Sequence, residues 1–185
     1  MFISDGYKLD RACFAALIEK YGANLHLLKL KDCALNSDFI EAISRSHEFD
    51  NLHSLFLIAN DLEDAGLQAM AESGMLSNLK TLSLRGNRFS DRAIEVFVKS
   101  NPPRNLTSLN LRHNQIGDCG AVALANSEIS TKIKLLNLSN NQIGDRGAIA
   151  LANSPKLKKV TKLYLRSDLI GIAINIDGTT TSRMV

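Results

Sequence analysis

Two histidines are the first residues in this chain whose types and spacing could do chemistry. His26 and His53 stand 27 residues apart, and imidazole is a common ligand of zinc and other transition metals. If that interval brings the two rings side by side, a metal ion could bridge them. However, no carboxylate or cysteine recurs at the same interval to complete a site. We interpret the pair as surface histidines, and we expect no metal and no cofactor.

Candidate nucleophiles lack the partners that catalysis requires. A serine recurs five times at the same interval, at Ser46, Ser73, Ser100, Ser127 and Ser154. A nucleophile needs one activated hydroxyl, so this column predicts capping or turn hydroxyls. Cys119 has no histidine in register, and the sequence contains no glycine-rich phosphate loop, Ser-His-Asp order or His-Glu-x-x-His motif. The sequence therefore favours a protein that is not an enzyme and has no small-molecule substrate.

The 27-residue interval runs through most of the chain as columns of apolar residues. Three columns repeat six times, at Leu25, Leu52, Leu79, Leu106, Ile133 and Val160; at Leu28, Leu55, Leu82, Leu109, Leu136 and Leu163; and at Leu30, Leu57, Leu84, Leu111, Leu138 and Leu165. Two further columns follow in each unit, at Cys33, Asn60, Asn87, Asn114, Asn141 and Asp168, and at Leu35, Leu62, Phe89, Ile116, Ile143 and Ile170. Each unit reads LxxLxLxx(N/C)x(L/I), and a fixed period of this kind indicates a solenoid of stacked units.

The first half of each unit predicts a short strand. Leu-x-Leu places two side chains on one face of a strand, and stacked units then form a parallel sheet with that face inward. The chain turns after the strand, and an asparagine amide can both donate to and accept from the turn's backbone groups. The asparagine column therefore predicts a ladder of hydrogen bonds from unit to unit. Cys33 can do this only weakly, and an ionised Asp168 cannot donate, so we expect a looser last unit.

The second half of each unit predicts a helix, because apolar residues such as Ile94 and Phe97 recur there at helical spacing. Two further columns lie at the predicted start of the helix. One holds acids of the first turn, at Asp64, Asp91, Asp118 and Asp145, and the other holds small residues, at Gly66, Ala93, Gly120 and Gly147. An acid suits the unpaired amides and the dipole at a helix N-terminus. A small residue would let the helix approach the strand layer closely.

A unit such as LTSLNLRHNQIGDCGAVALANS resembles the ribonuclease-inhibitor-like class of leucine-rich repeats, and the resemblance covers residues 25–171. It implies an α/β fold, a horseshoe solenoid with a parallel sheet on the concave side and helices on the convex side. It also implies binding of other proteins and no chemistry. Similar compact arrays occur in bacterial effector proteins delivered into host cells, so the resemblance extends to that type.

The two ends of the chain should differ from the middle, because solenoid ends must cover the core. Residues 8–21 fit the helix half of a unit with a one-residue shift that aligns Leu9, Phe14 and Leu17 with the buried columns. We expect an N-terminal capping helix in residues 1–24 and six repeats in residues 25–171. In residues 172–185, alternating isoleucines and an Asp-Gly pair predict a short hairpin-like cap, and a frayed tail is the alternative.

Composition and charge exclude several classes of protein. The chain is 45% apolar and 22% charged, as in ordinary globular domains. We find neither a signal peptide nor an apolar run long enough for a membrane span, so we expect no membrane association and synthesis in the cytoplasm, with delivery into a host cell if the protein is an effector. Three widely spaced cysteines, Cys13, Cys33 and Cys119, predict free thiols.

Partner binding is expected from strand residues that point away from the core, onto the concave face. The candidates are Leu27, Lys29, Lys31, Phe56, Ile58, Arg85, Arg112, Tyr164 and Arg166. Leu27, Phe56 and Ile58 form an apolar patch, and Arg85 and Arg112 stand on adjacent strands beside it. An apolar anchor flanked by arginines is typical of a protein-binding hot spot. In the alternative interpretation, Phe56 packs against Leu27 as part of the N-terminal cap.

The sequence therefore predicts a module that binds another protein. The resemblance favours an enzyme with an accessible cleft as that partner. Inhibition by covering that cleft and simple tethering as an adaptor both remain open. Nucleic acid is the rival partner because the formal net charge is +3 and one concave column is largely basic. The charge is modest for tracking phosphates and aromatic stacking residues are few, so nucleic-acid binding is the weaker hypothesis.

Overall fold

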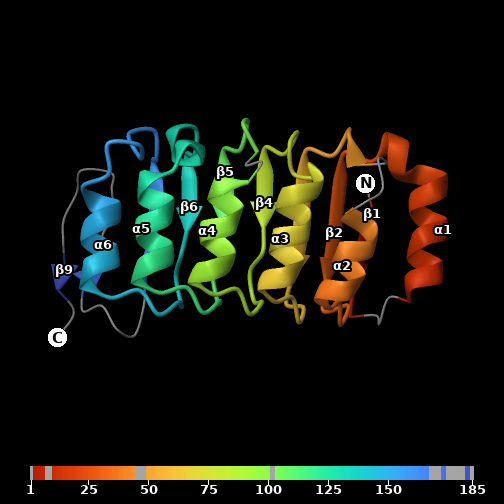
Figure 1. The fold of residues 1–185 in the computed structure, drawn as a ribbon, viewed down its shortest axis with the longest axis horizontal. Helices are drawn as coiled ribbons and strands as arrows, with labels where there is room; N and C mark the ends of the chain where they lie inside the picture. The colour runs from red at the N-terminus through yellow and green to blue at the C-terminus, as the bar shows by residue number, and fades with distance from the viewer. Residues whose placement is uncertain are drawn as a thin grey trace.

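Short strands and helices alternate along the chain in a computed structural model that describes residues 2–6, 10–44, 49–100, 103–166, 172–173 and 182–183 (Figure 1). The strands are β1 (Phe2–Asp5), β2 (Leu27–Lys31), β3 (Ser54–Ile58), β4 (Thr81–Ser83), β5 (Ser108–Asn110), β6 (Leu135–Asn137), β7 (Lys162–Tyr164), β8 (Ile172–Ala173) and β9 (Ser182–Arg183). The α-helices are α1 (Arg11–Tyr21), α2 (Ser37–Ser44), α3 (Asp64–Ser73), α4 (Asp91–Lys99), α5 (Asp118–Asn126) and α6 (Asp145–Ala152). Two 3-10 helices are also present, η1 (Gly22–Asn24) and η3 (Glu128–Thr131).

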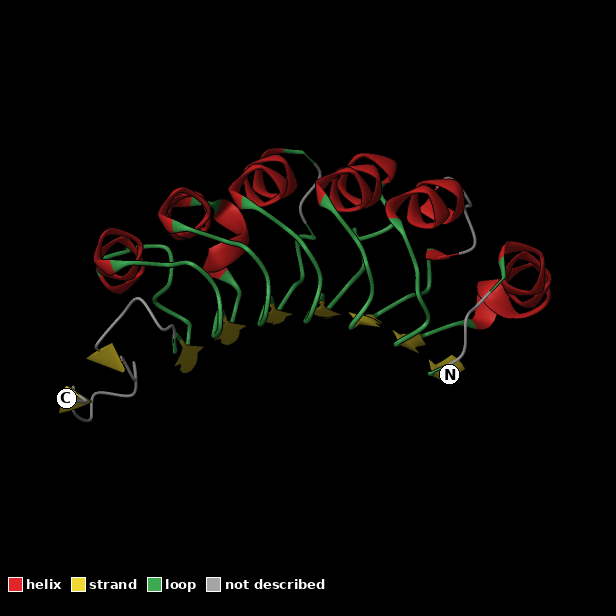
Figure 2. Cartoon of the chain, turned by 90° about the horizontal axis from the view of Figure 1, so that it is seen from below, coloured by secondary structure: helices red, strands yellow, loops and turns green. Residues whose placement is uncertain are grey.

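Strands β1 to β7 form one parallel sheet in sequence order, and the helices form a second layer. Figure 2 shows both layers as an arc, with the strands on its concave side and the helices on its convex side. The predicted register is confirmed, since Leu28 pairs with Leu55 and Leu82 pairs with Leu109. All three leucine columns are buried between the two layers. The expected horseshoe solenoid is therefore confirmed.

The first strand, β1, was not predicted from the sequence. It pairs with β2 so that Asp5 lies beside Lys31, and the next residue, Gly6, donates its N–H to the Lys31 carbonyl at 2.9 Å. Residues 2–21 thus have the strand and helix of a repeat unit, offset by 26 residues from the next unit rather than 27. The helix α1 begins after Asp10, whose carboxylate accepts a hydrogen bond from the Ala12 N–H at 2.6 Å.

The asparagine ladder is confirmed, and Asn114 illustrates it. Its side-chain oxygen accepts from the Phe89 N–H at 3.1 Å, and its amide donates to the carbonyls of Leu84 at 3.1 Å and Leu111 at 3.0 Å. Two of those three partners belong to the preceding unit. Asn60, Asn87 and Asn141 make equivalent bonds. Cys33 contributes a thiol donor to the Lys31 carbonyl at 3.2 Å, while Asp168 lies outside the described residues.

A second ladder joins the helix layer, and its rungs are the first-turn aspartates. Asp91 accepts from the Gly117 N–H at 2.6 Å, and Asp118 accepts from Gly144 and Gly147 at 2.8 and 2.9 Å. Each acceptor lies one unit before its donors. This contact accounts for two of the small residues, because a Cβ would lie 2.6 Å from the Asp91 carboxylate at Gly120 and 2.7 Å from the Asp118 carboxylate at Gly147. These two glycines therefore admit the neighbouring aspartate, in addition to the closer approach to the strand layer that the sequence suggested.

A third recurring feature is a residue with a left-handed backbone conformation in the turn that follows the strand. Five units and the N-terminal segment share it, at Gly6, Asp32, Ala59, Gly86, His113 and Asn140. Only glycine adopts this conformation without cost, and asparagine, aspartate and histidine adopt it more readily than alanine. The left-handed residue turns the chain out of the sheet, and it places the preceding side chain at the edge of the concave face.

The ends and the serine column complete the fold. Ser73 and Ser127 donate to carbonyls three residues earlier, at 3.1 and 2.8 Å, so their capping role is confirmed; Ser46 lies outside the described residues. Strand β8 pairs with β9 in antiparallel fashion, whereas Leu9 and residues 174–181 lie outside the description. Within the described part of the chain, the helices are too short or too polar to span a bilayer.

Candidate functional site on the concave face

The register of the sheet brings the predicted site residues together on the concave face in two groups. Lys29 pairs with Phe56, Lys31 pairs with Ile58, and Leu27 lies beside Ser54. Arg85 and Arg112 follow the next two strands on adjacent units, as the bond from the Gly86 N–H to the Arg112 carbonyl at 2.9 Å shows. Tyr164 and Arg166 lie on and after β7, two units beyond Arg112 and four units beyond Phe56 and Ile58. The residues do not form one continuous cluster.

The apolar group consists of Leu27, Phe56 and Ile58, all of which are half-buried. Their core-facing neighbours Leu28, Leu55 and Leu57 are fully buried, so the sheet separates the two sets of side chains. A half-buried phenylalanine and isoleucine on adjacent positions of one face leave apolar surface in contact with water. Leu27 and Phe56 sit on neighbouring strands, which is also the arrangement that packing within the N-terminal end would require.

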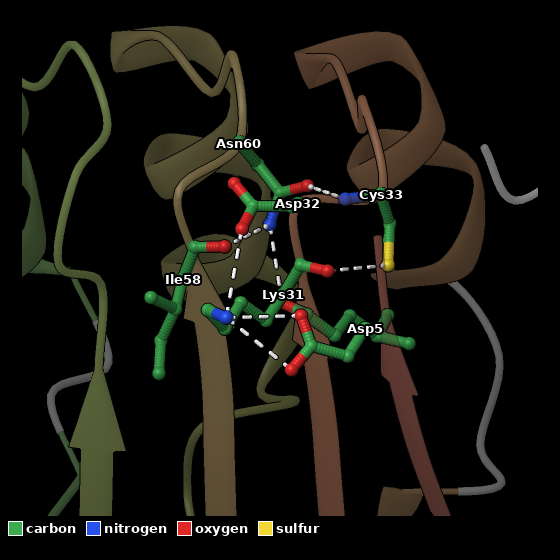
Figure 3. A network of polar contacts seen from close by, with 7 residues as sticks. Asp5, Lys31, Asp32, Cys33, Ile58 and Asn60 are labelled. Carbon is green, nitrogen blue, oxygen red and sulfur yellow. Dashed lines mark hydrogen bonds and ion pairs between the residues drawn. The ribbon is translucent and has the colours of Figure 1, made fainter. Parts of the chain in front are cut away.

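Lys31 differs from the other candidates because acidic side chains hold it. Its Nζ lies 3.0 Å from the Asp5 carboxylate and 3.7 Å from Asp32 (Figure 3). The hydrogen bond and charge of Asp5 are the main causes that raise the pKa of Lys31, which therefore stays protonated. The sequence did not predict this arrangement, because Asp5 belongs to the unpredicted strand β1. An exposed pair of this kind contributes little to stability, but it lowers the net positive charge at this end of the face.

Arg85 and Arg112 are the opposite case, because no ion pair holds either guanidinium among the described residues. The Nε of Arg112 is the one buried side-chain nitrogen or oxygen that lacks a hydrogen-bond partner in that part of the chain. His113 follows Arg112 in the left-handed position, and its side chain is exposed. Desolvation lowers the pKa of His113, and the positive charges of Arg112 and Arg85 lower it further. Arg85 and Arg112 thus form a positive cluster that has no ion pair among the described residues, and this cluster disfavours protonation of the neighbouring His113.

The central surface beside this cluster contains two serines that expose little of their side chains. Ser83 and Ser139 are buried, with 4% and 8% of their surface exposed. Ser83 pairs with Phe56 on one side and with Asn110 on the other, so larger neighbours cover its short side chain. Asn110 accepts from the Arg112 N–H at 3.1 Å, and Asn137 accepts from the Ser139 N–H at 3.0 Å. Each amide oxygen therefore accepts one hydrogen bond within its own turn.

At the far end, Tyr164 has 44% of its surface exposed and Arg166 is exposed as well. The lysine-rich stretch beside them is partly neutralised, since Lys156 forms an ion pair with Glu128 of the preceding unit. Lys162 lies on β7 and is exposed. This end carries one aromatic ring and scattered positive charge.

In the part of the chain that the structure describes, the other residues that could do chemistry do not come together as a site. The rings of His26 and His53 lie side by side with centroids 5.6 Å apart, and each Nδ1 lies within hydrogen-bond distance of the Asn51 carbonyl. Within the described ranges, no group of three histidine, cysteine or acidic residues could hold a metal ion. The thiol of Cys33 is buried and that of Cys119 is exposed. A hollow of about 660 Å³ lies among the loops that follow the helices, lined by Asn78, Arg104 and Glu128 among others, and it contains none of the predicted site residues.

Comparison with known proteins identifies the repeat. A family model described as Leucine Rich repeat matches residues 76–98, 103–125 and 130–152. A solved structure that matches is an internalin from Listeria monocytogenes, at 21% sequence identity and a TM-score of 0.48. The match covers 92% of this chain and 48% of the internalin chain, so the chain spans about half the length of that structure. A search of curated proteins found no match. The matched repeats and the stacked strands and helices make this chain a leucine-rich-repeat solenoid in fold.

Proposed function

We propose that the chain is a non-catalytic module that binds a folded protein partner on its concave face. The observation that carries this proposal is the pairing of half-buried Phe56 and Ile58 with a positive cluster that has no counter-charge among the described residues. An apolar anchor beside arginines is the composition of protein-binding hot spots. Leucine-rich repeats generally bind other proteins, which supports the same function.

The geometry also supports a finer proposal, in which the chain inhibits its partner by covering an active cleft. Hydrogen-bond ladders in both layers hold the arc rigid, so binding would cost little ordering entropy. The 27-residue unit with an α-helix supports assignment to the ribonuclease-inhibitor-like class. An adaptor that tethers its partner without inhibiting it is the alternative. Localisation in the cytoplasm, or delivery into a host cell as an effector, remains a proposal of the same kind.

The test compares capture by the wild-type chain with capture by two variants. Phe56→Ala removes the proposed anchor, and Lys99→Ala removes an exposed side chain at the end of α4 on the convex layer. Quantitative mass spectrometry measures the amount of each captured protein. A partner of the concave face should be captured in equal amounts by the wild type and by Lys99→Ala, and in a smaller amount by Phe56→Ala. If both variants retain the same proteins as the wild type, the proposed function is wrong. If the captured partner is an enzyme, its activity with and without the chain separates inhibition from tethering.

A further inference from the structure

The centre of the concave face presents more hydrogen-bond donors than acceptors. Arg85 and Arg112 carry guanidinium groups, which only donate. Asn110 is an amide with one acceptor oxygen, and that oxygen already accepts from the Arg112 N–H at 3.1 Å. Its NH₂ group, with two donor hydrogens, and one lone pair of the oxygen remain for a ligand. Asn137 on the next strand is in the same state, with its oxygen held by the Ser139 N–H at 3.0 Å.

The donors are adjacent to one another. Asn110 pairs with Asn137 in the sheet, and Arg112 follows Asn110 by two residues on the same face. Arg85 lies one unit before Arg112, at the spacing of neighbouring strands, about 4.8 Å. Four donor side chains therefore line one area of the face without an acid between them. The Nε of Arg112 is buried beneath this area and has no hydrogen-bond partner among the described residues, so no acceptor there fixes this guanidinium.

We propose that this donor surface binds carboxylates of an acidic protein segment, with the apolar patch of Phe56 and Ile58 receiving a neighbouring apolar side chain. This proposal rests on the proposed function and names the chemistry of its partner. A carboxylate only accepts, and it matches the guanidinium fork in two-point geometry. An acidic segment with one aromatic or aliphatic residue would satisfy both surfaces at once.

Charge on the rest of the face favours an acidic protein segment over nucleic acid. A phosphate backbone needs a continuous positive track, because its affinity comes from many phosphate contacts. The positive surface is instead interrupted at its N-terminal side, where Asp5 and Asp32 neutralise Lys31, and Arg88 is held by Asp61 at 2.8 Å. Among the described residues, the positive charge on this face that no ion pair compensates is that of Lys29, Arg85, Arg112 and the exposed residues near β7.

A pentapeptide with blocked ends, four glutamates around a central phenylalanine, provides a direct probe. We expect it to shift the NMR resonances of Arg85, Asn110 and Arg112, and we expect the glutamine version of the peptide to leave them unchanged. The double variant Arg85→Gln/Arg112→Gln should weaken binding of the glutamate peptide about tenfold or more. A matched double variant, Lys99→Gln/Lys158→Gln, loses the same charge away from the concave face and should bind as the wild type does. Arg112→Lys keeps the charge without the fork, so it should restore only part of the affinity.

Several outcomes would overturn the proposal. These are equal binding of the two peptides, equal binding by the arginine double variant and the wild type, and no binding of the glutamate peptide at millimolar concentration. Tighter, competing binding of a twenty-base oligothymidine would assign the surface to nucleic acid. The two proposals fail separately. A captured partner whose affinity depends on Phe56 and not on either arginine would refute only the carboxylate proposal, whereas peptide binding here combined with partner binding on the helices would refute only the concave-face function.

Discussion

The carboxylate of Asp118 accepts a hydrogen bond from the backbone N–H of Gly147, which lies 29 residues later in the next unit, at 2.9 Å. The same oxygen accepts from Gly144 at 2.8 Å. An aspartate at the start of one helix therefore binds the start of the following helix. This contact makes the glycine a requirement of the stacking, because a Cβ would lie 2.7 Å from the carboxylate oxygen and 3.0 Å from the Ala121 Cβ.

Gly147→Ala should consequently destabilise the protein by about 1–3 kcal/mol, the usual cost of overpacking. The direction of the change in the free energy of unfolding is informative, because the same substitution in an unconstrained helix stabilises by about 1 kcal/mol. Urea unfolding followed by circular dichroism measures the difference. Gly66→Ala is the control, since its closest contact is the Ser37 hydroxyl at 3.1 Å, and it should cost less. A Gly147→Ala variant more stable than the wild type would refute the role of the aspartate ladder.

Asn114→Ala should destabilise the protein by about 3 kcal/mol or more. The substitution leaves the Phe89 N–H and the Leu84 and Leu111 carbonyls without their partner, and each unsatisfied buried group costs about 1–3 kcal/mol. Thermal and urea unfolding should both show the loss. Asn78→Ala removes an exposed amide that donates to the Asp50 carbonyl, and its effect should stay within about 1 kcal/mol. Equal effects of the two substitutions would contradict the ladder.

The sequence predicted the repeat register because the residues that fix it are apolar side chains facing the core, and their period is visible in one dimension. The roles of Asp118 and Gly147 were only half predicted. Each was interpreted within its own unit, as a dipole partner and as a small residue, because a bond between units depends on the lateral offset of neighbouring helices. The left-handed residues after the strands, such as Ala59 and His113, were not predicted. Among these positions only Gly6 and Gly86 are glycines, the residue type that indicates a left-handed backbone in a sequence.

The N-terminal strand escaped prediction because its offset is 26 residues and its four residues contain a single clear match to the leucine columns. That omission affected the site. Lys31 was expected as a free contact residue, and its ion pair with Asp5 could not be anticipated without β1. Arg85 and Arg112 were placed correctly on adjacent units because their column follows the core columns directly. The donor character of Asn110 was missed, since it depends on which atom its own turn occupies.

Leu109→Asp should unfold or split the array. Leu109 is fully buried in β5, and burial of a leucine side chain contributes about 1.5–3 kcal/mol before the cost of a buried charge is counted. A circular dichroism melt should show loss of the cooperative transition. Ser108→Asp, on the opposite face of the same strand, is the control and should retain a melt close to that of the wild type. If Leu109→Asp melts like the wild type, the assignment of faces is wrong.

His113 should titrate below its ordinary pKa of 6.5, because desolvation and the charges of Arg112 and Arg85 disfavour its protonated form. An NMR titration should show this, and Arg112→Gln should move the pKa upward. A histidine whose folded pKa is lowered takes up its proton more readily in the unfolded chain. Stability should therefore fall as the pH drops below 6.5 towards the folded pKa. His113→Asn, which tolerates the left-handed backbone, should remove this dependence; a folded pKa at or above 6.5 would contradict the cluster's geometry.

The central claim is that the concave face binds a protein through an apolar anchor beside the positive cluster. Isothermal titration calorimetry of the captured partner against Phe56→Ala tests it most directly. We predict a loss of about 2 kcal/mol or more, which is about a thirtyfold weaker Kd, with an unchanged melting curve. Lys99→Ala on the convex layer should bind as tightly as the wild type. Wild-type affinity for Phe56→Ala together with loss of binding by Lys99→Ala would contradict the account and place the binding surface on the helices.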